Sequence, residues 1–273
     1  MLELKLKKSP RPFLEVTNLT PDKLMSLTVA QIEKLPIIQG NESCLVGDLI
    51  SVTGDPSDGH QVWSGDLVKV VGIGHEMRSG WIQIEGHCGN HLGSRMLGGT
   101  IHVKGNAGDY VGAEMTGGLL HISGDAGNHL GAAYDGGQNG QNGGAILIDG
   151  NAGHFVGKGM RRGLIAIGKD AGHQCGFGMK AGTILVCGSC GSDIGQEMIR
   201  GTIVLQQASK SPLAGFQSAG IQPAPILNIL AIYLKNLGFG RTLSTDNNYE
   251  LHHGDCLRGS RGELFIATPA GTD

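Results

Sequence analysis

The cysteines are the first residues of this sequence that could support chemistry. Cys187 and Cys190 form a C-x-x-C motif within the stretch CGSC. This spacing is typical of thiol redox centres and of one half of a four-cysteine zinc site. The chain has six cysteines but no second C-x-x-C, so a four-cysteine site is not complete. A redox or metal role and simple packing are the two interpretations, and the surrounding pattern must decide between them.

Two pairs of histidines also have a regular spacing. His102 and His121 are 19 residues apart, as are His154 and His173. Two neutral imidazoles on adjacent elements could share a metal ion, but such a site usually needs a third ligand and supporting partners. The equivalent neighbouring positions hold other residue types: Gln83 and Leu147 beside the first pair, and Asn128 and Ser192 beside the second. We therefore favour solvated ladders over a metal-dependent enzyme.

Basic and glycine-rich stretches complete the set of candidates. Lys158, Arg161 and Arg162 gather in GKGMRRG and could meet an anionic ligand or an acidic partner, although an ordinary charged corner is favoured. The stretch MLGGTIHVKGNAGDYVGAE looks like a phosphate-binding loop, but neither it nor its neighbours contain G-x-x-x-x-G-K-[ST]. Neither a nucleophile elbow nor a convincing pair of carboxylates is present. The sequence predicts no nucleotide site, no catalytic residues, and no cofactor-binding or metal-binding residues.

The glycine-rich stretch is one unit of an internal repeat. Successive starts are 19 residues apart, except for a gap of 45 between residues 115 and 160. That gap contains two repeats and seven extra residues, YDGGQNG, at 134–140. The repeats start at Met77, Met96, Met115, Gln141, Met160, Met179 and Met198. A drifting composition bias would not keep this register, so the repeat must reflect structure.

Each unit contains the same short elements. In the unit of Met96, an alternating apolar pair, Ile101 and Val103, follows a glycine and indicates a short strand with one buried face. Gly105, Gly108 and Gly112 then supply tight corners. Short strands and glycine corners at a fixed period predict an all-β, single-stranded parallel β-helix of about seven 19-residue coils. Equivalent residues should lie about 4.8 Å apart on adjacent coils.

This register assigns the cysteines to the core. Cys190 falls where other coils carry alanine, Cys88 occupies the same rung, and Cys175 occupies a rung of leucine and valine. A buried cysteine behaves as a small apolar residue. We therefore expect packing, not metal binding, at these three positions.

One outward ladder becomes apolar halfway along the stack. It begins with Gln83, His102 and His121 and continues with the candidate interface residues Leu147, Ala166, Leu185 and Val204. A contiguous exposed apolar stripe should be covered. Either a helix at about 224–238 or another subunit is expected to cover it.

The regions outside the repeat define the domain organisation. We expect an N-terminal extension with short helices at 1–46, the coils at 47–207, and a C-terminal extension at 208–273 with a helix at about 224–238 and a terminal strand. Residues 46–55 and 64–77 look like degenerate opening coils. Thr20 and Thr28 are expected N-caps, with Gln31 completing a capping box.

Charge and hydropathy exclude several classes of protein. The net charge of −3 gives no reason to expect nucleic acid or an anionic membrane as partner. The longest apolar run, residues 226–234, is far shorter than the roughly 20 residues that span a bilayer. The N-terminus does not resemble a signal peptide. We expect a cytoplasmic protein with reduced thiols.

The repeat motif M-x-x-G-x-I-x-V-x-G-x-x-G-x-x-x-G resembles the GXGXG domain. Two groups carry this domain: the C-terminal domain of the glutamate synthase large subunit, and the C subunit of formylmethanofuran dehydrogenase with its bacterial relative in the formyltransferase/hydrolase complex. The second group resembles nearly the whole chain. The resemblance rests on NLTPDKLMSLTVAQIEKLPIIQGN, VGDLISVTGD, GAAYDGGQNGQNGGAI, PLAGFQSAGI and GDCLRGSRGELFIA.

The resemblance implies a right-handed β-helix and a role in one-carbon metabolism. It implies a non-catalytic structural subunit beside formyltransferase, amidohydrolase-like and dehydrogenase-like subunits. The complex would transfer formyl from formyltetrahydromethanopterin to a methanofuran-type carrier and release formate. The carrier, the tetrahydromethanopterin substrate and any molybdenum or tungsten pterin would belong to partner subunits. A molybdenum or tungsten dehydrogenase and a glutamate-synthase-like scaffold are the alternatives.

Overall fold

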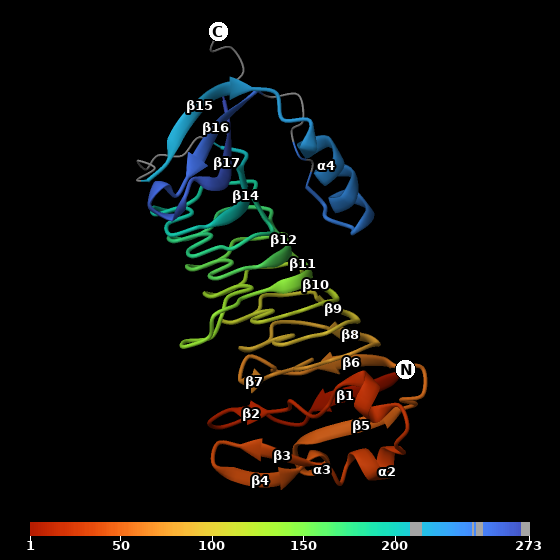
Figure 1. Cartoon of the computed structure of the whole chain (residues 1–273). Helices are drawn as coiled ribbons and strands as arrows, with labels where there is room; N and C mark the ends of the chain where they lie inside the picture. The colour runs from red at the N-terminus through yellow and green to blue at the C-terminus, as the bar shows by residue number, and fades with distance from the viewer. Residues whose placement is uncertain (208–214, 242, 244–247, 269–273) are drawn as a thin grey trace.

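The computed structural model describes residues 1–207, 215–241, 243 and 248–268. These residues form two sheets, one of 13 strands in the order β15-β16-β17-β14-β13-β12-β11-β10-β9-β8-β6-β1-β5, and one of four strands in the order β4-β3-β2-β7 (Figure 1). The fold is β-rich with a large parallel sheet, as the repeat predicted. The predicted hand of the winding and the number of coils are interpretations, and the observed strand pairing is compatible with them.

The repeats supply successive parallel strands of the large sheet. A coil is the chain from one repeat start to the next, and each coil contributes one of these strands. The strands are β8 (Trp81–Ile84), β9 (Thr100–Val103), β10 (Leu119–Ile122), β11 (Asn142–Ile148), β12 (Arg162–Ile167), β13 (Thr183–Val186) and β14 (Arg200–Leu205). Ile101 pairs with Leu120, and Leu120 with Ile146. The seven extra residues therefore leave the register unchanged.

The six repeat-opening methionines lock neighbouring coils together. All six side chains are fully buried: Met77, Met96, Met115, Met160, Met179 and Met198. A β-carbon on Gly99 would lie 2.5 Å from the Met77 methyl group, and one on Gly118 would lie 2.7 Å from that of Met96. The methyl group of each methionine thus occupies the space that a side chain on the next coil would need. This contact explains why methionine and glycine recur three residues apart.

The corner glycines are required for two different reasons. Gly112 has a φ of 60°, where glycine meets no steric penalty. Gly105 and Gly108 have ordinary backbone angles, but a β-carbon on Gly105 would lie 2.7 Å from backbone atoms of Gly86. On Gly108 it would lie 3.0 Å from the backbone nitrogen of Asn90. These two glycines therefore allow the coils to approach closely.

The N-terminal region closes one end of the stack with antiparallel pairing. It contains β1 (Leu2–Leu6), β2 (Leu14–Glu15), β3 (Pro36–Gln39), β4 (Glu42–Leu45) and β5 (Ile50–Gly54). Because β1 is parallel to β6 (His60–Ser64) and β2 is parallel to β7 (Val70–Val71), the first residues form the opening rungs. The prediction that 46–55 is an opening coil is wrong, since β5 is antiparallel to β1.

Short helices connect the N-terminal strands. They are α1 (Pro21–Leu24), α2 (Val29–Ile32) and α3 (Val46–Leu49). Thr28 is confirmed as an N-cap: its Oγ1 accepts from the Gln31 backbone nitrogen at 3.3 Å, and Gln31 Oε1 accepts from the Thr28 nitrogen at 2.8 Å. Thr20 precedes α1 but makes no side-chain capping bond. It is fully buried and packs instead of capping.

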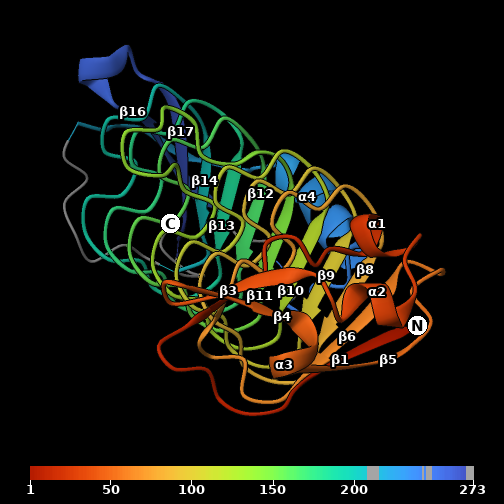
Figure 2. The same ribbon diagram turned by 90° about the horizontal axis from the view of Figure 1, so that it is seen from below.

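The C-terminal region closes the other end. β17 (Arg261–Ala267) adds a parallel strand beside β14, and β16 (Tyr249–Gly254) and β15 (Gln217–Gln222) follow it in antiparallel order. The 3₁₀ helix η1 (Cys256–Arg258) joins β16 to β17. Helix α4 (Ile226–Asn236) lies outside the parallel sheet, across the strands of the last coils (Figures 1 and 2). Residues 208–214 and 269–273 of the predicted C-terminal extension lie outside the described residues.

Candidate functional site

The histidines of the outward ladder are held by polar neighbours. His102 and His121 are register partners with ring centres 5.2 Å apart. His121 Nε2 lies 3.1 Å from Asp149 Oδ2, and His102 Nε2 lies 3.3 Å from Ser123 Oγ. Burial, followed by the neighbouring His121, lowers the pKa of His102. Across the described residues, no group of three or more His, Cys, Asp and Glu side chains is placed to hold a metal ion.

The second histidine pair belongs to a ladder of side-chain acceptors. His154 Nδ1 accepts from the backbone nitrogen of His173 at 2.9 Å, and His173 Nδ1 accepts from that of Ser192 at 3.0 Å. Asn90 and Asp109 make the same bond from earlier coils. In the neutral rings the proton therefore sits on Nε2. These imidazoles satisfy the backbone of the next coil, which is a structural use of their nitrogen atoms.

The cysteines pack in the rungs that the repeat assigned to them. Ala171 and Cys190 form a parallel bridge, Leu67 bridges Cys88, and Cys175 is fully buried. Burial raises the pKa of Cys88 to about 12, and that of Cys187 to about 11. The thiolate is the form that binds metals and attacks disulfides, so burial disfavours the reactive form of Cys88 and Cys187.

A stack of rings along one corner is a feature that sequence reasoning missed. His91, Tyr110, His129 and Phe155 follow one another on successive coils, with ring centres 5.2, 4.6 and 5.0 Å apart. Tyr134, from the seven-residue insertion, stacks on Tyr110 at 5.2 Å, and its hydroxyl lies 2.8 Å from His91 Nδ1. The stack therefore anchors the insertion to the coils. Aromatic residues recurring after the Gly-x corner were its signal in the sequence.

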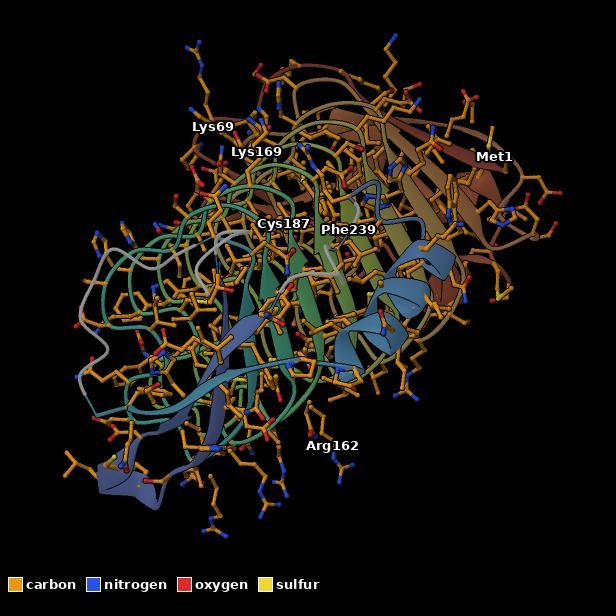
Figure 3. All side chains as sticks on the ribbon, turned by 90° about the horizontal axis from the view of Figure 1, so that it is seen from above. Met1, Lys69, Arg162, Lys169, Cys187 and Phe239 are labelled. Carbon is orange, nitrogen blue, oxygen red and sulfur yellow. The ribbon has the colours of Figure 1, made fainter. Side chains whose placement is uncertain are left out.

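In the basic corner, Lys158 has an ion pair among the described residues, whereas Arg161 and Arg162 do not. Lys158 Nζ lies 3.3 Å from Asp135 Oδ1 and 5.7 Å from the centre of the Phe155 ring. Arg161 and Arg162 are exposed and have no ion pair within the part of the chain that the structure describes. Arg162 projects away from the start of β12 (Figure 3). Only the two arginines are available to a partner.

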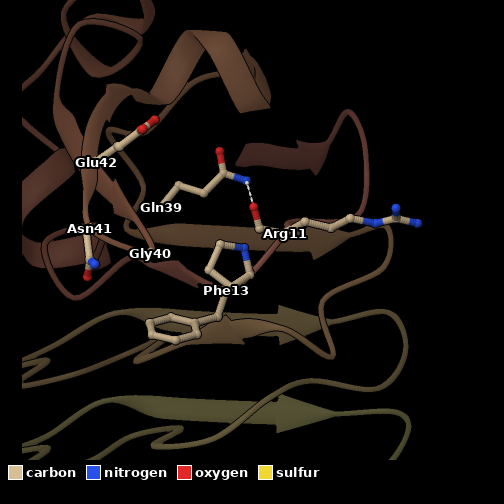
Figure 4. Close-up of a pocket in the computed structure, with 7 residues that line it drawn as sticks. Arg11, Phe13, Gln39, Gly40, Asn41 and Glu42 are labelled. Carbon is tan, nitrogen blue, oxygen red and sulfur yellow. Dashed lines mark hydrogen bonds between the residues drawn. The ribbon is translucent and has the colours of Figure 1, made fainter.

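A shallow pocket lies at the N-terminal end of the stack (Figure 4). It has a volume of about 530 Å³, and Phe13 on its wall is 48% exposed. Gln39 Nε2 donates to the Arg11 carbonyl oxygen at 3.3 Å, which holds the wall of the pocket together. Arg11 and Glu42 provide one charge of each sign. This lining contains no pair of groups suited to acid–base or nucleophilic catalysis.

The apolar outward ladder is covered by the chain's own helix. Leu147, Ala166, Leu185 and Val204 are all fully buried. They belong to one apolar cluster with Leu227, Leu234 and Phe239. These four residues are therefore not an exposed interface for another subunit, because α4 occupies that position. The ladder instead fixes α4 on the sheet.

Helix α4 is itself apolar on the side that faces away from the sheet. Ile226, Ile229, Ile232 and Tyr233 are 54, 65, 63 and 49% exposed. A helix that is apolar all round is normally buried. The outer face of α4 is therefore the strongest candidate interaction surface of the described chain.

Comparisons with known proteins point to a single group. No protein-family model matches the chain. The C subunit of tungsten-containing formylmethanofuran dehydrogenase 2 from Methanothermobacter wolfeii is 32% identical over 92 residues, and that from Methanothermobacter marburgensis is 34% identical over 92 residues. Each alignment covers 32% of this chain and 34% of the relative. The matched segment thus spans about a third of the length of these curated relatives.

A solved structure matches over nearly the full length. A chain of the formyltransferase/hydrolase complex from Methylorubrum extorquens, determined in complex with methylofuran, superposes with a TM-score of 0.92 and 32% sequence identity. The superposition covers 98% of this chain and 100% of that chain. None of the described helices is long and apolar enough to span a membrane. The full-length identity shows that this chain belongs to the family formed by the C subunit of formylmethanofuran dehydrogenase and its counterpart in formyltransferase/hydrolase complexes.

Proposed function

We propose that the chain is a non-catalytic structural subunit of a formyltransferase/hydrolase complex. The complex would transfer formyl from formyltetrahydromethanopterin to a methanofuran-type carrier and release formate, in the cytoplasm. The observation that carries this proposal is the superposition on a chain of such a complex, at 32% identity over 98% of this chain. The way the repeats use their polar side chains, as acceptors for the next coil, supports a structural role.

In this role the stack of coils serves as a rigid scaffold for the other subunits. Seven in-register repeats between two antiparallel ends are compatible with a right-handed parallel β-helix of about seven coils. In a solenoid each repeat contacts only its neighbours, so the stack presents long side faces to other chains. We assign the formyltransferase, amidohydrolase-like and dehydrogenase-like subunits to those faces. The carrier and the pterin substrate would bind to these other subunits.

A tungsten or molybdenum formylmethanofuran dehydrogenase is the second candidate. It is favoured by the curated relatives, whose names describe them as C subunits of tungsten-containing formylmethanofuran dehydrogenase 2. Burial raises the pKa of Cys88 and Cys187, which disfavours the thiolate that would bind a metal at these two positions. In that case, too, the metal would lie on another subunit. A glutamate-synthase-like scaffold is a weaker candidate, since the matches are to the formyl-transferring group.

Purification of the tagged chain from its native host tests the proposal. We expect it to co-purify with formyltransferase-family and amidohydrolase-family subunits, and the preparation to release formate from formyltetrahydromethanopterin when the carrier is present. Stoichiometric tungsten or molybdenum with carrier-dependent oxidation would favour the second candidate. A tagged chain that elutes alone, without formate release, would refute both. A His121→Ala variant of the complex should keep full activity, since the proposal gives this histidine no part in the reaction.

A further inference from the structure

The outer face of α4 continues into a crevice beside the sheet. The crevice has a volume of about 200 Å³, and Ile226, Ile229 and Tyr233 of the helix line it opposite Thr183, Thr202 and Val204. Its walls are mainly apolar, and three of the lining side chains are the exposed ones described above. Such a crevice can receive an apolar side chain of a partner, as the buried centres of protein interfaces do.

A positively charged hollow adjoins the crevice. Thr202 lines both the crevice and this second hollow of about 440 Å³, which also contains Arg200, Arg261 and His253. Arg200 and Arg261 are direct register partners on β14 and β17. Like charges on adjacent rungs repel each other, and within the described residues neither guanidinium has an ion pair. Glu263 also lines this hollow, where its Oε2 accepts a hydrogen bond from Thr202 Oγ1 at 3.1 Å, so two positive charges stand against one negative charge in the lining.

The α4 segment carries only positive charge. Residues 221–243 contain Lys235 and Arg241 but no aspartate or glutamate. Lys235 and Arg241 line a third hollow at the end of the helix, together with the exposed Ile232. The apolar centre is thus bordered by basic groups at both ends, an arrangement that complements an apolar surface with an acidic rim.

We propose that this surface, formed by the outer side of α4 and the starts of β13, β14 and β17, is where a different subunit of the complex docks. The occupant presents an apolar side chain to the crevice between Ile229 and Thr202, and carboxylates to Arg200 and Arg261. This inference rests on the proposed function, since it names a contact within that complex. The contact lies on the exposed side of α4 and in the crevice beside it, where Val204 is the one member of the apolar ladder that lines the wall.

A second copy of the chain fits this surface less well. In a two-fold dimer the same patch meets itself, so the basic groups that border α4 would face one another with Glu263, already bonded to Thr202, as the acidic group of the patch. If the patch met a different face of a second copy, the contact would be heterologous and would tend to form open chains of molecules. The charge pattern therefore favours a different, acidic partner.

Two variants with a matched control test the docking surface. Ile229→Asp places a charge in the apolar centre, and it leaves the buried anchors Leu227 and Leu234 in place. Arg200→Glu with Arg261→Glu reverses the charge of the hollow. Val68→Asp is the control, because Val68 is 56% exposed and lies outside the surface. Each tagged chain is produced together with the whole complex, and mass spectrometry measures the molar ratio of each identified subunit to the tagged chain.

We expect the molar ratio of one formyl-transferring subunit to the tagged chain to fall about tenfold or more in Ile229→Asp and in the double arginine variant. A loss of this size is typical of interface hot spots. Val68→Asp should retain wild-type amounts, and all three should melt within a few degrees of the wild type. Wild-type retention by Ile229→Asp would refute the docking surface while leaving the proposed function intact. Failure of the wild-type chain to bind any formyl-transferring subunit would instead refute the proposed function. A dimer of the isolated chain that Ile229→Asp dissociates would show that a second copy is the occupant.

Discussion

Replacing one corner glycine measures how tightly the coils are stacked. Gly105 and Gly86 occupy equivalent positions of adjacent coils, and both have backbone angles that alanine adopts freely. An alanine at 105 would place its β-carbon 2.7 Å from the Gly86 carbonyl carbon and oxygen, whereas an alanine at 86 would meet nothing within 4 Å. Gly86→Ala is therefore a control with the same chemical change and the same effect on the unfolded chain.

The cost of Gly105→Ala follows from the displacement that it forces. Ordinary contact begins at about 3.4 Å, so the coils must separate by about 0.7 Å, the difference from 2.7 Å. Overpacking of this kind costs about 1–3 kcal/mol. The displacement also lengthens the bond from Gly105 N to Gly86 O, now 3.1 Å, and that from Asn106 N to His87 Nδ1, now 2.9 Å. Each bond contributes about 1 kcal/mol.

Equilibrium unfolding and thermal melting provide the assay. Both alanine variants gain about 0.4–1 kcal/mol from a less flexible unfolded chain, so Gly86→Ala should equal or exceed the wild type. Gly105→Ala should be about 2–4 kcal/mol less stable than Gly86→Ala, which corresponds to a melting difference of about 4–16 °C for a domain of this size. Equal melting temperatures for the two variants would refute the claim that glycine at this corner sets the coil spacing.

Three further predictions follow from buried and hydrogen-bonded groups. Burial lowers the pKa of four imidazoles below the ordinary 6.5: His75, His91, His102 and His129. The unfolded chain therefore binds more protons, so the free energy of unfolding should have its highest value above about pH 6.5 and decline below it. Urea titrations across this range would contradict this if stability rose on acidification. Leu185→Ala should cost about 2–5 kcal/mol by leaving a cavity under α4, and hydrogen exchange should show α4 opening before the coils. Thr28→Val should lose about 1 kcal/mol with its cap, whereas Thr20→Val should not, because Thr20 makes no capping bond; equal losses in urea would argue against the difference.

The sequence predicts the coils well because residues that stack on adjacent coils recur at the same position of each repeat. The 19-residue register places Ile101 beside Leu120 and Cys190 beside Ala171, as the strand pairing has them. It also predicts that either a helix or another subunit covers the apolar ladder, and α4 is found there. These features depend only on residues one repeat apart, so a pattern in the chain can reveal them.

Contacts between segments that are not one repeat apart leave no periodic pattern in the sequence, so the repeat does not predict them. β1 joins the stack beside β6 although Leu2–Leu6 has neither the methionine nor the glycine of the repeat. The alternation in Ile50–Gly54 is the same for parallel and antiparallel strands, which is why residues 46–55 were predicted to be an opening coil although β5 is antiparallel to β1. The contact of Tyr134 with the ring stack depends on how the insertion folds back.

The geometry of the stack also explains why the proposed docking surface includes α4, a segment outside the repeat. Within the coils, polar corner residues such as Asn90, Asp109 and His154 accept hydrogen bonds from the backbone of the next coil, so those atoms are already occupied. Apolar rungs are equally occupied by the adjacent coils. The most exposed isoleucines of the described residues come instead from α4, a segment outside the period. The proposed docking surface therefore lies largely on an addition to the repeat, and α4 has the largest exposed apolar face among the described helices.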